Sequence, residues 1–140
     1  FGPLAWREQA WVEVLTDPTW TTVVWCPDGP VRGAMVVLVS RPESSLASLA
    51  VHPAYRRRGV GCSFVQDAVR RARDARAKWI SLEVDRDNRA AVALYFRAGF
   101  RVCRRFDEDG RPRLEMCRRL ARAQLRPALP RRGAAKVSLL

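Results

Sequence analysis

Two glycines that follow a run of arginines are the first residues of this chain that could do chemistry. The stretch VHPAYRRRGVGCSF, residues 51–64, joins Arg56–Arg58 to Gly59 and Gly61. At the start of a helix several backbone N–H groups lack partners, and the helix dipole favours an anion there. Glycine lets the backbone turn tightly and approach a ligand without a Cβ in the way. The spacing therefore predicts a cradle of backbone donors for a pyrophosphate, with a simple tight turn as the alternative.

The elements around this loop must position it. Residues 44–51 are expected to form a strand that ends at the His52–Pro53 step. Residues 62–78 place apolar side chains on one stripe of a helix, and residues 79–84 are a nearly continuous apolar strand. A strand, loop, helix and strand in this order predict a βαβ crossover. We expect His52, the chain's one histidine, to be a turn residue and not a catalytic base.

The remaining segments complete an α/β sandwich with a mixed sheet. Asn88 suits a helix N-cap and Gly99 a left-handed stop, while PDGP at residues 27–30 is turn chemistry between two β-branched runs. The expected elements are a helix at 4–15, strands at 19–26 and 31–39, a helix at 88–99, and strands at 100–106 and 111–120.

The positive charge of the chain is concentrated at its C-terminal end. The formal net charge is +12, and residues 118–140 hold seven basic residues and no acidic one, which leaves +5 for residues 1–117. Pro127, Pro130 and Gly133 interrupt this end of the chain, so we expect a folded domain at 1–120 and a basic, disordered tail at 121–140. A body at +5 suits many anionic partners, among them a nucleotide-bearing cofactor, and we expect no nucleic-acid partner.

The cysteines and apolar segments bear on the cell compartment. No segment approaches the about 20 apolar residues that span a bilayer, and no signal-peptide pattern is present, so we expect a cytoplasmic protein with no membrane association. Cys26, Cys62, Cys103 and Cys117 form no CxxC pair, and we expect reduced thiols and no metal site. Because the chain begins at Phe1, we also expect an incomplete N-terminus.

Two linked motifs resemble the GNAT superfamily of acetyl-CoA-dependent N-acetyltransferases. The family's [QR]-x-x-G-x-[GA] matches residues 56–61, RRRGVG, and LEVDRDNRAAVALYFRAGFRV at residues 82–102 looks like its second signature. The resemblance covers Leu46 to Val102, and its second half is especially similar to ribosomal-protein alanine N-acetyltransferases. It implies a mixed, mostly antiparallel sheet whose central parallel strands splay apart, flanked by helices.

The resemblance also implies an acetyl-CoA site. The backbone of the strand before the glycines would hold the pantetheine arm, backbone N–H groups of residues 57–62 would hold the pyrophosphate, and the Asn88 side chain would contact the arm. Arg56 fills the motif's [QR] position. The cofactor-binding residues expected by resemblance are Leu49, Ala50, Val51, Arg56, Arg57, Arg58, Gly59, Val60, Gly61, Cys62 and Asn88.

Acetyl transfer requires a neutral amine to attack the thioester, and amines are mostly protonated at neutral pH. By resemblance, Glu83 stands where the family's general base lies and Tyr95 where a general acid can protonate the departing thiolate. Three alternatives stay open: Glu83 as a carboxylate paired with an arginine, Tyr95 as a core aromatic, and Asn88 as a helix cap only.

The resemblance therefore predicts direct transfer of an acetyl group from acetyl-CoA to a primary amine. The acceptor is left open between a protein N-terminus and a small-molecule amine, because the segment at residues 104–116 is short and holds one aromatic residue, Phe106. A homodimer is also left open. The alternatives are a truncated GNAT fold that binds CoA without efficient catalysis, and a basic nucleic-acid-binding module.

Overall fold

The computed structural model describes residues 15–120, which form one six-stranded sheet with two α-helices on it. The strands lie in the order β1-β2-β3-β4-β6-β5, and all neighbours are antiparallel except β3 and β4. Their bounds are β1 Trp20–Trp25, β2 Gly33–Leu38, β3 Glu43–Val51, β4 Trp79–Asp85, β5 Arg101–Glu108 and β6 Arg111–Arg119.

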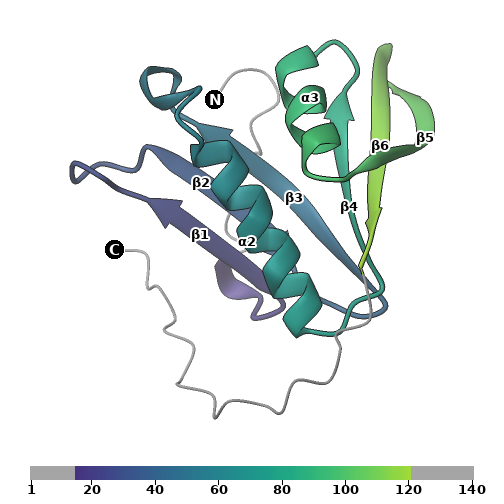
Figure 1. Ribbon diagram of the computed structural model, residues 1–140, viewed down its shortest axis with the longest axis horizontal. Helices are drawn as coiled ribbons and strands as arrows, with labels where there is room; N and C mark the ends of the chain where they lie inside the picture. The colour runs from purple at the N-terminus through teal and green to yellow at the C-terminus, as the bar shows by residue number, and fades with distance from the viewer. Residues whose placement is uncertain (1–14, 121–140) are drawn as a thin grey trace.

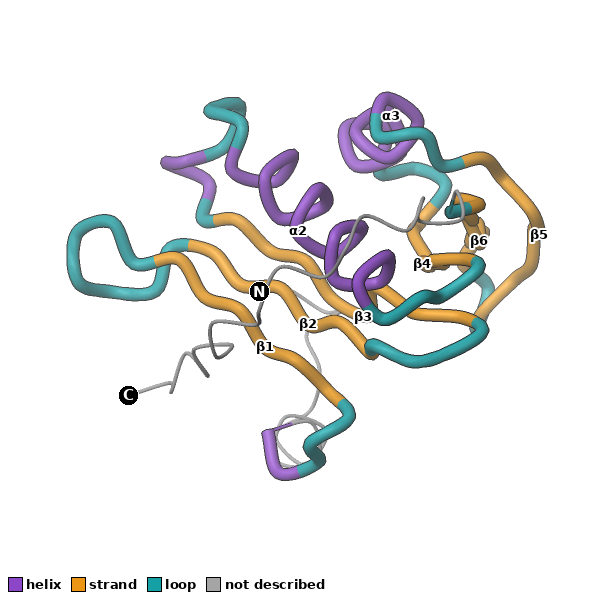
Figure 2. Tube along the Cα trace, turned by 60° about the horizontal axis from the view of Figure 1, so that its bottom comes forward, coloured by secondary structure: helices purple, strands orange, loops and turns teal. Residues whose placement is uncertain are grey.

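Both helices cover the same face of the sheet (Figures 1 and 2). Helix α2, Val60–Asp74, lies over β2 and β3, and helix α3, Arg89–Arg97, lies beside β4. A short 3₁₀-helix, η1 at Pro53–Tyr55, precedes α2. The apolar stripe predicted for α2 is buried, and it packs into one core with Met35, Leu46, Ile80 and Phe100.

The two central strands separate part of the way along their length. β3 pairs with β4 in parallel through Glu43–Leu46 and Trp79–Leu82, and no pairing continues beyond Leu46. The second half of β3, residues 47–51, keeps its partner β2 but pairs with no described strand on its other edge. This splay leaves backbone groups of β3 without ladder partners on the edge that faces β4.

The predicted fold class is confirmed within the described residues: a mixed, mostly antiparallel sheet with splayed parallel central strands and flanking helices. The predicted strands agree with the observed ones to within about two residues, and η1 was not predicted. The helix expected at 4–15 and the tail at 121–140 lie outside the described residues, apart from Leu15. No helix in the described part of the chain is both long and apolar enough to cross a bilayer.

The prediction of four reduced thiols is wrong for one pair. Cys103 and Cys117 form a disulfide that joins β5 to β6, with their Cα atoms 6.0 Å apart. Cys103 lies at a register shift between Val102 and Arg104, two residues beyond Arg101, which is the ladder partner of Cys117. Spacing alone could not show this pairing, because the two cysteines are 14 residues apart and meet only through strand register. Cys26 and Cys62 are free thiols.

Candidate active site

A cavity of about 590 Å³ lies where β3 and β4 separate. Its walls come from β3, β4, helix α3 with its N-cap Asn88, and the β5–β6 hairpin. Three of the residues singled out for chemistry from the sequence, Glu83, Asn88 and Tyr95, line it together. The fold therefore brings a carboxylate, an amide and a phenol into one space.

The cavity reaches both faces of the sheet. Leu82 and Val84 pack in the core with Tyr95, on the face that carries the helices. Because side chains alternate along a strand, Glu83 and Asp85 project from the opposite face of β4. One end of the cavity is therefore lined by α3 and the other by charged side chains.

Glu83 lies among arginines but accepts no hydrogen bond from the described residues. Its carboxylate is 3.9 Å from an Arg104 Nη and 3.8 Å from an Arg113 Nη, and its side chain is 48% exposed. Arg104 Nε donates a shorter hydrogen bond, of 2.7 Å, to the Glu115 carboxylate. Glu115 is the residue that pairs with Glu83 across the β4–β6 ladder. Glu83 thus combines both readings of the sequence: it faces the cavity, and it lies at ion-pair distance from two guanidinium groups.

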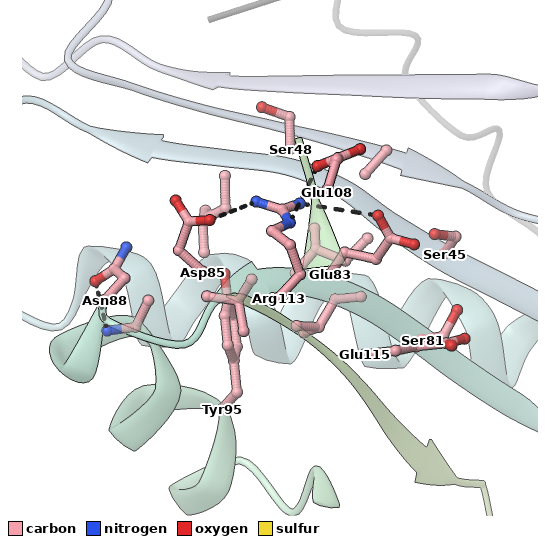
Figure 3. Close-up of a pocket in the computed structure, with 16 residues that line it drawn as sticks. Ser45, Ser48, Ser81, Glu83, Asp85, Asn88, Tyr95, Glu108, Arg113 and Glu115 are labelled. Carbon is pink, nitrogen blue, oxygen red and sulfur yellow. Dashed lines mark hydrogen bonds and ion pairs between the residues drawn. The ribbon is translucent and has the colours of Figure 1, made fainter. Parts of the chain in front are cut away.

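Arg113 is the centre of the charged end of the cavity. Figure 3 shows Asp85, Glu83 and Glu108 around its guanidinium. Asp85 accepts a hydrogen bond from Arg113 Nη1 at 3.1 Å, while Glu108 lies 3.3 Å from Nε. Nε is buried and makes no hydrogen bond with the described residues. One guanidinium is thus shared among three carboxylates without satisfying all its donors.

Tyr95 and Asn88 form the end of the cavity near α3. Tyr95 is 8% exposed and packs edge-on against Phe100, and burial raises its pKa to about 12. Its hydroxyl makes no hydrogen bond with the described residues, so this donor is free for a ligand. The Asn88 Oδ1 accepts a hydrogen bond from the Ala91 N–H at 3.2 Å, which confirms the predicted N-cap. The Asn88 Nδ2 atom makes no hydrogen bond with the described residues, so it can serve a second partner.

The arginine–glycine loop between η1 and α2 forms a turn with unpaired donors. Gly59 is the N-cap of α2 with φ of +79°, and Arg57 also adopts a left-handed conformation with φ of +60°. Within the described residues, no backbone oxygen accepts from the N–H groups of residues 57–62. Consecutive N–H groups in such a turn form a concave anion site, and the helix dipole adds positive potential to it.

The loop is held in place by side chains on both sides. Arg56 Nε donates a hydrogen bond to the Val51 carbonyl at 3.1 Å, which closes the loop onto the end of β3. Arg58 lies 5.4 Å from the centre of the Tyr55 ring, and the Tyr55 hydroxyl donates to Asp28 in the β1–β2 turn at 2.8 Å. Two of the three arginines are therefore engaged in positioning the loop.

At Gly61, the packing of the two helices favours a residue without a side chain. A Cβ at this position would lie 3.3 Å from a methyl group of Leu94, so the absence of a side chain lets α2 approach α3 closely. At Gly59, by contrast, a Cβ would meet nothing within 4 Å, and the positive φ is what requires glycine.

The structure separates the expected cofactor residues into groups. Leu49 and Asn88 line the cavity between β3 and β4, whereas Ala50 and Val51 continue β3 without lining it. Arg58, Gly59 and Val60 line a smaller cavity of about 240 Å³ against β1. Cys62 is half-buried in the first turn of α2. His52 caps η1 through Nδ1, as expected of a turn residue.

Sequence reasoning missed the charged residues that share the cavity with Glu83. These are Asp85, Glu108, Arg113 and Glu115. Part of the signal was available, because Asp85 follows Glu83 by two residues on one strand and must face the same side. The register that places Glu115 opposite Glu83 is a long-range feature with no mark in the local sequence.

Several known structures that resemble this chain are named as acetyltransferases. Nourseothricin acetyltransferase is 30% identical, with a TM-score of 0.67 over 74% of this chain and 66% of that one, just under two thirds of its length. The ribosomal-protein-S18-alanine N-acetyltransferase from Escherichia coli is 20% identical, with a TM-score of 0.75 over 89% and 85%. A GNAT family acetyltransferase from Elizabethkingia anophelis, with acetyl-CoA bound, is 15% identical with a TM-score of 0.67 over 81% and 84%. The last two likenesses concern the fold alone.

Among curated proteins, none matches this chain significantly. Residues 3–100 match the family described as the acetyltransferase (GNAT) family, which is well over half of the 140 residues. The match includes both the loop at 56–61 and the segment that carries Glu83, Asn88 and Tyr95. The chain therefore belongs to the GNAT acetyltransferase family.

Proposed function

We propose that this protein transfers an acetyl group from acetyl-CoA to a primary amine by direct attack of the amine on the thioester. Membership of the family implies acetyl transfer from acetyl-CoA. The observation that carries the amine acceptor and the mechanism is the cavity between β3 and β4, which holds Glu83, Asn88 and Tyr95 and reaches both faces of the sheet. Such a cavity lets a cofactor and an acceptor meet from opposite sides.

The residues of the loop and of β3 fit acetyl-CoA. The unpaired N–H groups of residues 57–62 suit the pyrophosphate, and Gly59 supplies the left-handed turn that points them together. The unpaired edge of β3 at residues 47–51 offers backbone donors and acceptors to the amide groups of the pantetheine arm. Asn88 Nδ2 is a further donor to the arm. Bound acetyl-CoA supplies the thioester whose C–S bond breaks in the reaction.

Glu83 is the carboxylate best placed to act as base. Of the cavity carboxylates on β4 and β6, Asp85 and Glu115 are each committed to a hydrogen bond with an arginine, whereas Glu83 accepts none from the described residues. It accepts the proton that the amine loses as the new C–N bond forms. A base at this position lets an amine that arrives protonated become nucleophilic inside the cavity.

Tyr95 assists the leaving sulfur. With a pKa of about 12, its phenol remains protonated at neutral pH. A thiol has an ordinary pKa of about 8.5, so a complete proton transfer from the phenol to the thiolate is unfavourable. Tyr95 therefore acts by donating a hydrogen bond to the sulfur as negative charge develops on it, and this refines its predicted role as a general acid.

The acceptor stays open between a protein N-terminus and a small amine. Identity to the enzyme named for nourseothricin is higher than identity to the one named for a ribosomal-protein alanine, so the comparisons do not favour a protein acceptor. A truncated fold that binds CoA without catalysis remains the alternative. Thiol release from acetyl-CoA in the presence of a panel of amines distinguishes the two: amine-dependent release supports the enzyme, and binding without release supports the alternative.

A further inference from the structure

The charge of the cavity differs in sign from the charge of the chain. Among the residues that the structure describes, four acidic side chains line it, namely Glu83, Asp85, Glu108 and Glu115, whereas Arg113 is the one basic residue that does so. Counting Arg104, which bridges Glu83 and Glu115 from outside the lining, the balance is four negative charges against two positive. A strongly basic protein thus keeps an acidic surface at its candidate active site.

The ion pairs here do not form a closed structural network. A network that served only to join strands would satisfy its buried donors, yet Arg113 Nε is buried and makes no hydrogen bond within the described part of the chain. Glu83 and Glu108 are each about half exposed, at 48% and 56%, and neither accepts a hydrogen bond from the described residues. Both carboxylates therefore have free acceptor positions directed at the cavity.

From this balance we propose that the acceptor is an amine with at least one further positive charge, such as a diamine or polyamine. The proposal rests on the proposed function, since it names the class of amine that the same cavity accepts. Glu83 receives the ammonium group that is to be acetylated, and the Asp85 and Glu108 carboxylates attract the second one. Glu83 and Asp85 are two residues apart on one strand, so their Cα atoms are about 7 Å apart. Standard bond lengths place the two nitrogens of an extended four-carbon diamine roughly 6 Å from each other.

Three probes of equal length test the role of the second charge: butane-1,4-diamine, 4-aminobutan-1-ol and 4-aminobutanoate. The second group is a cation in the first, neutral in the second and an anion in the third. We expect kcat/KM, measured by thiol release, to fall in that order, by about tenfold from the diamine to the amino alcohol. The difference should shrink as NaCl is raised, because salt screens charge pairs.

Two variants test whether the preference for a second positive charge arises in the cavity. In Glu108→Gln and in Asp85→Asn the diamine-to-amino-alcohol ratio should fall toward one. The matched control is Asp74→Asn, which removes the same charge at the exposed end of α2 and should retain the wild-type ratio. If Asp85→Asn does not fold, Glu108→Gln carries the comparison, since its carboxylate accepts no hydrogen bond from the described residues.

The outcomes separate the two proposals. Thiol release with all three amines at equal kcat/KM, or a ratio unchanged in Glu108→Gln, would overturn the dication proposal and leave the acetyltransferase standing. Absence of thiol release with every amine would count against the proposed function. In that case calorimetric titration of each amine into the CoA-saturated protein decides the matter: tighter binding of the diamine supports the acidic site, and equal binding overturns it.

Discussion

Replacement of Glu83 by glutamine tests the assignment of the base. Glutamine keeps the size of the side chain but cannot accept a proton at neutral pH. Since Glu83 is half exposed and accepts no hydrogen bond from residues 15–120, we expect the variant to fold with nearly unchanged stability. Loss of a general base typically lowers a rate by about 10²–10⁴-fold, and we expect kcat/KM at pH 7 to fall within that range.

The pH dependence of kcat/KM is a sharper test, because the size of the expected change can be calculated. An alkylamine with a pKa of about 10.4 is neutral in roughly one molecule in 2,500 at pH 7 and one in 25 at pH 9. Without a base in the cavity the reaction must use this neutral fraction, so kcat/KM of Glu83→Gln should rise about tenfold per pH unit, or 100-fold between pH 7 and pH 9. The wild-type profile should be flatter, because Glu83 removes the proton after the amine has bound.

Thiol release at saturating acetyl-CoA, followed from about pH 6 to pH 9.5, measures both profiles. Glu43→Gln is the matched control: it removes an exposed glutamate at the start of β3, outside the cavity, and should match the wild type. An unchanged rate for Glu83→Gln at pH 7 would assign the base to another carboxylate. A lowered rate with an unchanged pH slope would show that Glu83 positions the acceptor instead of accepting its proton.

Three further predictions concern the arginine–glycine loop, the Tyr95 phenol, and the β1–β2 turn that supports the loop. Gly61→Asp should weaken acetyl-CoA binding at least tenfold by calorimetry, because it adds negative charge at the start of α2 and bulk 3.3 Å from Leu94; wild-type affinity would refute the cradle. Tyr95→Phe should lower kcat about tenfold or more with little change in acetyl-CoA affinity, and an unchanged kcat would make Tyr95 a packing residue. Hydrogen bonds from Arg32 and Tyr55 lower the pKa of Asp28 from 3.8 to about 2, so its stabilising contribution is full above pH 3.8 and is lost as pH falls through about 2. Asp28→Asn should therefore have a lower Tm than the wild type at pH 6, and this difference should shrink as the pH falls through about 2; a difference as large at pH 2 as at pH 6 would contradict this.

Much of the fold could be predicted because its signals are local. The stripe of α2, the Asn88 cap and the turn at residues 27–30 each depend on neighbours within a few positions, and the structure places these elements where the sequence indicates. The splay between β3 and β4 was expected from the family resemblance and not from periodicity.

The rest could not be predicted because it depends on strand register. The Cys103–Cys117 disulfide depends on the pairing of β5 with β6, and Glu115 lies opposite Glu83 although the two residues are 32 positions apart in sequence. Arg113 was not singled out from the sequence, since nothing in its neighbours shows that it meets three carboxylates. The negative charge of the cavity is therefore a property of the folded sheet, and it is opposite in sign to the net charge of the chain.

Calorimetric titration with acetyl-CoA tests the central claim most directly, because every proposed step requires this cofactor. The unpaired N–H groups of residues 57–62, the free edge of β3 and Asn88 predict saturable binding at one site, with a Kd between about 1 μM and 1 mM. Absence of detectable binding at millimolar acetyl-CoA would contradict the account.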